Sequence, residues 1–181
     1  MIQNSKFKIQ NSRQGFTLIE LLVVMAIIGI LAATAIVDFG KNEDRDVRQE
    51  KDRLTSFLRE VQNKALAAEK ISGVSGKVCG FGVNQQGDSN IQTYYIVAAN
   101  LDADCSAATN TYDSSHKLDV FYLGKNVKVS GSFSDIFFLS PNGNVYYGGS
   151  SAFASPITIN LTKTGLDTPI PAYIDQSGRI Y

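Results

Sequence analysis

The spacing of hydrophobic and polar residues divides the chain into three main segments. Residues 16–37 are almost entirely apolar and carry a single charged side chain, Glu20. A helix of this length would extend about 33 Å, enough to cross a hydrocarbon core of about 30 Å. We therefore predict a transmembrane or assembly helix over residues 16–37. A carboxylate inside such a segment is costly in lipid, so Glu20 requires a functional explanation.

Residues 38–70 are dense in charge, yet their eight basic and eight acidic side chains balance. Apolar residues recur here with the spacing of one helical face: Val47, Leu54, Leu58, Val61, Ala65 and Ala68. The pattern predicts that the helix continues to residue 70 and packs its apolar stripe on a folded domain. No proline stands near residue 37 to kink the helix, although Gly40 could loosen it.

Beyond residue 70 the helical periodicity disappears. Runs of β-branched and aromatic residues alternate with Gly, Ser, Asn and Asp, which is typical of strands separated by turns. The predicted strands cover residues 77–83, 92–98, 118–123, 127–129, 135–139, 145–147, 156–161, 172–175 and 179–181. Turns are predicted at 140–144 and 176–178, and loops at 87–90 and 99–116. Together, residues 71–181 predict an antiparallel β-sheet or small β-sandwich packed on the helix, an α+β fold.

The N-terminal segment, residues 1–15, is polar and basic. It carries Lys6, Lys8 and Arg13 and no acid, like the basic region of a secretory signal, and such charge keeps that end in the cytoplasm. Residues 15–20 read Gly-Phe-Thr-Leu-Ile-Glu and lead directly into the apolar helix. This combination resembles the class III signal of type IV prepilins and type II secretion pseudopilins.

The resemblance implies that prepilin peptidase removes residues 1–15 on the cytoplasmic side, between Gly15 and Phe16. Phe16 would then carry a free, N-methylated amine. In a filament, Glu20 of one subunit could pair with the Phe16 amine of its neighbour, which would offset two buried charges and fix the register of the helices. The alternative is a plain single-pass anchor in which Glu20 extends toward the lipid headgroups.

The branch of the superfamily is indicated by residues outside this signal. Leu54, Leu58 and Ala65, followed by a strand with Val78, resemble minor pseudopilin H and its pilus relative, minor pilin T. The closing segment 174–180, in which Gly178-Arg179 follows a strand, is also similar to the end of that family. The resemblance implies the pilin fold: one long helix on an antiparallel β-domain.

The two cysteines, Cys79 and Cys105, would both lie outside the cytoplasm, where a thiol pair commonly forms a disulfide if geometry allows. Two unpaired thiols remain the alternative. His116 is the only histidine, so a four-coordinate zinc site is not expected. No phosphate-binding loop, nucleophile elbow or His–carboxylate pattern is found, and we predict neither an enzyme nor a cofactor.

Charge gives little support for nucleic-acid binding. The precursor has no net charge, and the cations considered for a DNA patch are Lys125, Lys128 and Arg179. Asp102, Asp104 and Asp113 could supply oxygen ligands to calcium, but their spacing matches no dedicated loop.

The sequence therefore predicts a non-catalytic subunit of a type II secretion pseudopilus or type IV pilus. It would be anchored once in the bacterial inner membrane, with its C-terminal domain outside the cytoplasm. Its expected partners are other subunits, the peptidase and the assembly platform. The alternative is a minor pilin at the tip that binds DNA or surfaces.

Overall fold

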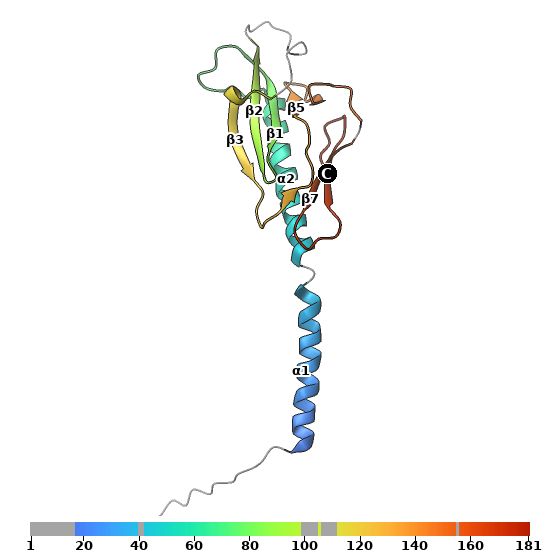
Figure 1. The fold of residues 1–181 in the computed structure, drawn as a ribbon. Coiled ribbons are helices and arrows are strands. Elements are labelled where there is room, and N and C mark those ends of the chain that lie inside the picture. The colour runs from blue at the N-terminus through green and yellow to red at the C-terminus, as the bar shows by residue number, and fades with distance from the viewer. Residues whose placement is uncertain (1–16, 40–41, 99–104, 106–111, 155) are drawn as a thin grey trace, which may run out of the picture. The chain divides into compact units, whose positions relative to one another are not determined.

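The computed structural model describes residues 17–39, 42–98, 105, 112–154 and 156–181, with the side chains of 34–39 and 42 excepted. The chain divides into two compact units, Met1–Lys41 and Asn42–Tyr181 (Figure 1). The first contains helix α1, Leu18–Phe39, and the second begins with helix α2, Asn42–Leu66. The predicted continuous helix would run through residues 40 and 41, which lie outside the described residues, as do the leader, Gly15 and Phe16.

Helix α2 ends four residues earlier than predicted, and the structure shows why. The N–H of Glu69 donates to the Lys64 carbonyl at 3.1 Å, and the N–H of Ala68 donates to the Ala65 carbonyl at 3.0 Å. Ala68 itself has a φ of 47°, in the left-handed region. These features define a Schellman motif, which satisfies the last carbonyls and reverses the chain. The prediction that Ala68 lies on the buried stripe is therefore wrong, because it is exposed in this cap.

Two antiparallel sheets follow α2, as the predicted fold class requires. The larger sheet has the order β3-β2-β1-β5-β6 and the smaller one the order β4-β7-β8. Their strands are β1 Lys77–Gln86, β2 Asn90–Ala98, β3 Lys117–Tyr122, β4 Lys128–Val129, β5 Ile136–Leu139, β6 Val145–Tyr147, β7 Ile157–Thr162 and β8 Ile170–Ile174. The predicted last strand, 179–181, is reduced to one bridge between Ile174 and Ile180, because the turn at Gly178 leaves little chain to pair.

The main core lies between α2 and both sheets. Val47, Leu54, Leu58, Val61 and Ala65 are each at most 1% exposed, so these members of the predicted stripe are buried as expected. The helix contacts β1 and β5 of the larger sheet and β7 and β8 of the smaller one. One helical face thus holds the two sheets together, and this packing, rather than helix propensity, stabilises so charged a helix.

A second, smaller core covers the opposite face of the larger sheet. It contains Cys79, Tyr94, Ile96, Ala98, Cys105, Phe137 and Leu139. Tyr94 lies over Gly82 of β1, where a Cβ would come within 2.5 Å of the tyrosine ring. Glycine at this position therefore allows the large ring to lie flat on the strand.

Candidate functional site

The N-terminus of α1 is closed by a threonine cap. The N–H of Glu20 donates to the carbonyl oxygen of Thr17, at 3.1 Å, and to its hydroxyl oxygen, at 3.3 Å. Thr17 is thus the N-cap and Glu20 the third helical residue, which is the spacing of a capping box. The cap explains why the helix begins at Leu18. Because it uses only the backbone of Glu20, the exposed carboxylate takes no part in it.

From Leu18 to Leu31, the surface of α1 is dominated by exposed apolar side chains. Its large apolar residues from Leu18 to Leu31 are between 47% and 83% exposed. Within these residues Glu20 is the only charged side chain. A helix that is hydrophobic all round is normally covered by lipid or by other helices. In the part of the chain that the structure describes, no helix combines the length and the hydropathy needed to cross a membrane.

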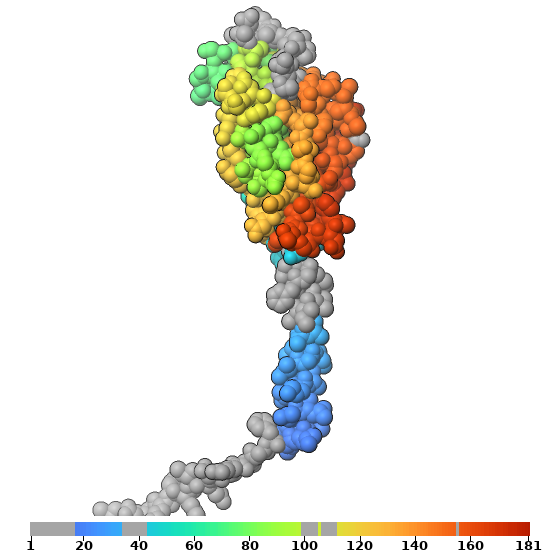
Figure 2. Space-filling view, viewed as in Figure 1, coloured from blue at the N-terminus to red at the C-terminus, as the bar shows by residue number. Residues whose placement is uncertain are grey.

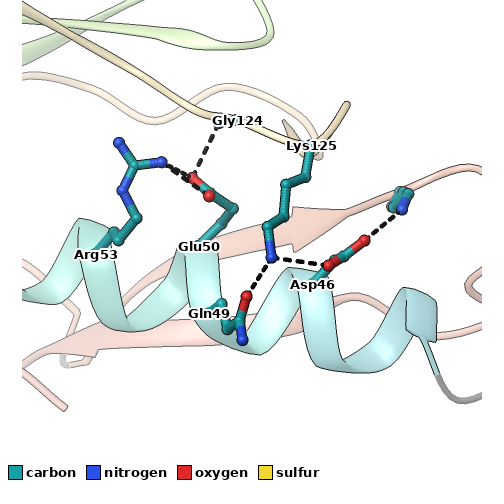
Figure 3. Close-up of polar contacts among 7 residues, drawn as sticks. Asp46, Gln49, Glu50, Arg53, Gly124 and Lys125 are labelled. Carbon is teal, nitrogen blue, oxygen red and sulfur yellow. Dashed lines mark hydrogen bonds and ion pairs between the residues drawn. The ribbon is translucent and has the colours of Figure 1, made fainter.

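The N-terminal half of α2 carries two carboxylates that bind other elements (Figure 3). Asp46 accepts hydrogen bonds from Lys163, at 2.8 Å, and from Lys125, at 2.9 Å. These bonds, that of Lys163 first, hold the pKa of the Asp46 carboxyl below its usual range. Gln49 also accepts a hydrogen bond from Lys125. Asp46 therefore holds the segments that carry Lys125 and Lys163, both distant in sequence, against α2.

Glu50 lies one turn further along and is almost fully buried, at 2% exposure. It accepts hydrogen bonds from Arg53 Nη1, at 2.6 and 2.8 Å, and from the N–H of Gly124, at 2.9 Å (Figure 3). Gly124 begins a tight turn closed by the Val127 N–H on the Gly124 carbonyl, with positive φ at Lys125 and Asn126. Those dihedrals are those of a type I′ turn. Asp46 and Glu50 together hold this turn against α2.

The predicted cysteine pair is bonded in the structure. The sulfur atoms of Cys79 and Cys105 are 2.01 Å apart. The bond joins β1 to residue 105 within the predicted loop 99–116, most of which lies outside the described residues. Tyr112, near the end of that loop, donates its N–H to Asp135 at 2.8 Å and packs edge-on against Tyr94. Pairing in the protein itself stays a prediction that thiol counting under denaturing conditions can test.

The remaining candidate ligands have structural roles or lie outside the description. Asp102 and Asp104 are not among the described residues. Asp113 caps a short 3-10 turn, where hydrogen bonds from the N–H and hydroxyl of Ser115 lower the pKa of its carboxyl. Among the described residues, no group of three or more His, Cys, Asp or Glu side chains could hold a metal.

The three cations considered for a DNA patch are each paired with a carboxylate. Lys125 pairs with Asp46, at 2.9 Å, while Lys128 lies 3.7 Å from Asp88 and Arg179 lies 3.2 Å from Asp175. Their charges are locally balanced, which does not favour a basic nucleic-acid surface.

Sequence reasoning missed the roles of Thr17 and Glu50. The signal for Thr17 is the Thr-x-x-Glu spacing itself. The signal for Glu50 is its position in the helix. This acid stands on the same helical face as the buried Val47 and Leu54. A charge on an apolar stripe indicates a buried partner.

Comparison with known families supports the N-terminal interpretation. Residues 10–36 match the prokaryotic N-terminal methylation motif. This motif is typical of type IV pilin- and pseudopilin-like proteins, which are structural and generally not enzymes. It implies processing by prepilin peptidase, an N-terminal inner-membrane anchor before assembly, and assembly partners in general. Comparisons with curated proteins and with solved structures gave no match.

Proposed function

We propose that the chain is a subunit of a type II secretion pseudopilus or type IV pilus. It is cleaved between Gly15 and Phe16, methylated at Phe16, and anchored once in the inner membrane. The observation that carries the proposal is the coincidence of three features: the methylation motif, the exposed apolar surface of α1 from Leu18 to Leu31, and a single carboxylate in the first turn of that helix. Assembly proceeds through α1, while residues 42–181 lie outside the cytoplasm.

In this proposal Glu20 pairs with the Phe16 amine of a neighbouring subunit. Two charges that would each be costly in an apolar bundle then offset each other, and their pairing fixes the axial register. The pairing requires the carboxylate, whereas the Thr17 cap requires only the backbone of Glu20.

This difference allows a matched experiment. Glu20→Ala should be processed and inserted into the membrane but incorporated poorly into filaments. Thr17→Ala removes the cap, at about 1 kcal/mol of helix stability, but keeps the carboxylate, so it should be incorporated. Sheared filaments can be analysed by immunoblotting against the membrane fraction. Normal incorporation of Glu20→Ala, or equal defects in the two variants, would show that the carboxylate has no special role.

Processing has its own test. Intact-mass analysis of protein from membranes should give a chain that begins at a methylated Phe16. A chain that begins at Met1, or one that begins after residue 37, would contradict the proposal as a whole.

We further propose that the chain belongs to the minor pseudopilin H and minor pilin T branch. The support is the buried helix pattern of Leu54, Leu58 and Ala65, together with the turn that places Arg179 after β8. A minor subunit should be present at far below one copy per major subunit in purified filaments. Quantitative mass spectrometry can measure that ratio, and a near-equal ratio would contradict this assignment.

A further inference from the structure

Strand β3 is one of the two edge strands of the larger sheet and, within the described residues, pairs only with β2 (Figure 1). The Leu123 N–H donates to the Ser89 carbonyl at 2.9 Å, and the same register pairs Phe121 with Ile91. In an antiparallel ladder the direction of the backbone groups alternates along the strand. Val120 and Tyr122 therefore present their N–H and C=O groups to the free edge, whereas Leu118 lies at a β-bulge, where the register with β2 shifts. Accordingly, among the residues that the structure describes, the Val120 N–H donates only to the neighbouring Asp119 carboxylate, at 2.7 Å.

The same strand concentrates exposed apolar surface. Outside α1, the exposed large hydrophobic residues of the described chain are Leu66, Leu118, Tyr122 and Tyr181. Two of these four, Leu118 and the 61% exposed Tyr122, belong to β3. In the space-filling view, residues of β3 form one margin of the domain surface (Figure 2). Native edge strands are usually short, charged or covered, so an open apolar edge indicates a binding partner.

The face of β3 that carries Phe121 borders a shallow depression of about 460 Å³ between this strand and α2. Its lining residues are Asp52, Arg53, Ser56, Phe57, Glu60 and Phe121. Phe57 and Phe121 stack with their ring centroids 4.6 Å apart, and the Arg53 guanidinium lies 5.4 Å from the Phe121 ring. Because β3 lies at the edge of the sheet, a strand that pairs with its free side would place alternate side chains beside this depression.

The charges near the edge determine what such a strand should carry. Arg53 is already bound to Glu50. Asp52 makes no ion pair within the described residues, and Asp119 lies on the same face of β3 as Phe121. Glu60, which is mostly exposed, also lines the depression, but it pairs with Lys64 at 3.2 Å and its charge is locally balanced. Within the described residues, Asp52 and Asp119 are therefore the carboxylates of this face that make no ion pair, and they favour a basic segment.

We propose that the free edge of β3 binds an extended segment of a second polypeptide by strand addition. That segment has apolar side chains at alternate positions, beside Leu118 and Tyr122, and lysine or arginine side chains facing Asp52 and Asp119. The backbone of the bound segment forms hydrogen bonds with the free N–H and C=O groups of β3. One of its carbonyl oxygens replaces the Asp119 carboxylate as acceptor for the Val120 N–H. The inference concerns the second unit alone and does not depend on the filament role.

The experiment uses the full chain in detergent and a fluorescent peptide of alternating valine and lysine, followed by anisotropy. Two control peptides isolate the interactions: one with N-methylated valines, which cannot donate to the edge, and one with glutamate in place of lysine. Each should bind at least about tenfold more weakly. Val120→Pro, which removes an edge N–H but no bond to β2, should weaken binding by a similar factor.

Milder variants guard against a loss of folding. Tyr122→Thr and Asp52→Asn should each weaken binding by about threefold, whereas Tyr181→Thr and Asp167→Asn, at exposed positions elsewhere, should leave it unchanged. Absence of binding, equal binding of the N-methylated peptide, or equal effects of the edge and control variants would overturn the proposal. Self-association of the chain that disappears in Val120→Pro would assign the edge to a second copy, and would likewise overturn it.

Discussion

Replacing Glu50 with alanine tests how a buried carboxylate holds the turn at Gly124 on α2. The change leaves the Gly124 N–H without its acceptor, which costs about 1–3 kcal/mol. The Arg53 side chain is 55% exposed, so water can solvate its guanidinium, and the lost ion pair adds only about 0–1 kcal/mol. We expect a total loss of about 1–4 kcal/mol in the free energy of unfolding, less than for a pair buried on both sides.

The matched variants are Glu50→Gln and Glu60→Ala. Glutamine keeps an oxygen that can accept from Gly124, so it should lose only about 1 kcal/mol. Glu60 is 65% exposed and pairs with Lys64 at 3.2 Å, so its removal should cost about 0.5 kcal/mol or less.

Urea unfolding of the fragment Asn42–Tyr181, followed by circular dichroism, gives the comparison. With a slope of about 2 kcal/mol per molar urea, Glu50→Ala should lower the midpoint by roughly 0.5–2 M. If it loses no more stability than Glu60→Ala, the buried carboxylate does not hold the turn and the reasoning is wrong.

Three further predictions use the same unfolding assay. Leu58→Ala should cost about 2–5 kcal/mol, because it leaves a cavity in the core, whereas Leu66→Ala, at a 45% exposed site of the same helix, should cost about 1 kcal/mol. Equal losses of stability in the two variants would contradict the packing of α2. Ala68→Gly should stabilise by up to about 1 kcal/mol, because glycine adopts the left-handed cap without strain, and a loss of stability would contradict the Schellman motif. The pKa of the Asp46 carboxyl is lowered in the folded state. Its ion pairs therefore stabilise the fold at pH values above the ordinary pKa of about 3.9, and this stabilisation is lost as the pH falls through the folded pKa. Asp46→Asn should therefore reduce the loss of stability between about pH 4 and pH 2, and an unchanged acid profile would refute this role.

Much of the fold follows from local patterns. The buried face of α2 was predicted from the spacing of Leu54, Leu58 and Val61, because helical periodicity brings those residues to one side whatever they contact. The larger sheet shows where such patterns fail. Strand β1 continues through Asn84, Gln85 and Gln86, polar residues that were left out of the predicted strand. They are extended because they pair with β2 from Gln92 to Asn90, and no local preference indicates this pairing.

The candidate functional residues also divide into those that local sequence predicts and those that depend on tertiary packing. The sequence alone determined the methylation motif, the apolar helix and the position of Glu20 in its first turn, since all of these depend on residues close together in the chain. Only the tertiary structure decided that Glu50 is buried under Gly124, 74 residues later, that Asp46 binds Lys163, 117 residues later, and that β3 lies at an open edge. Strand order and long-range ion pairs depend on how distant segments pack, and periodicity along the chain carries no information about that packing.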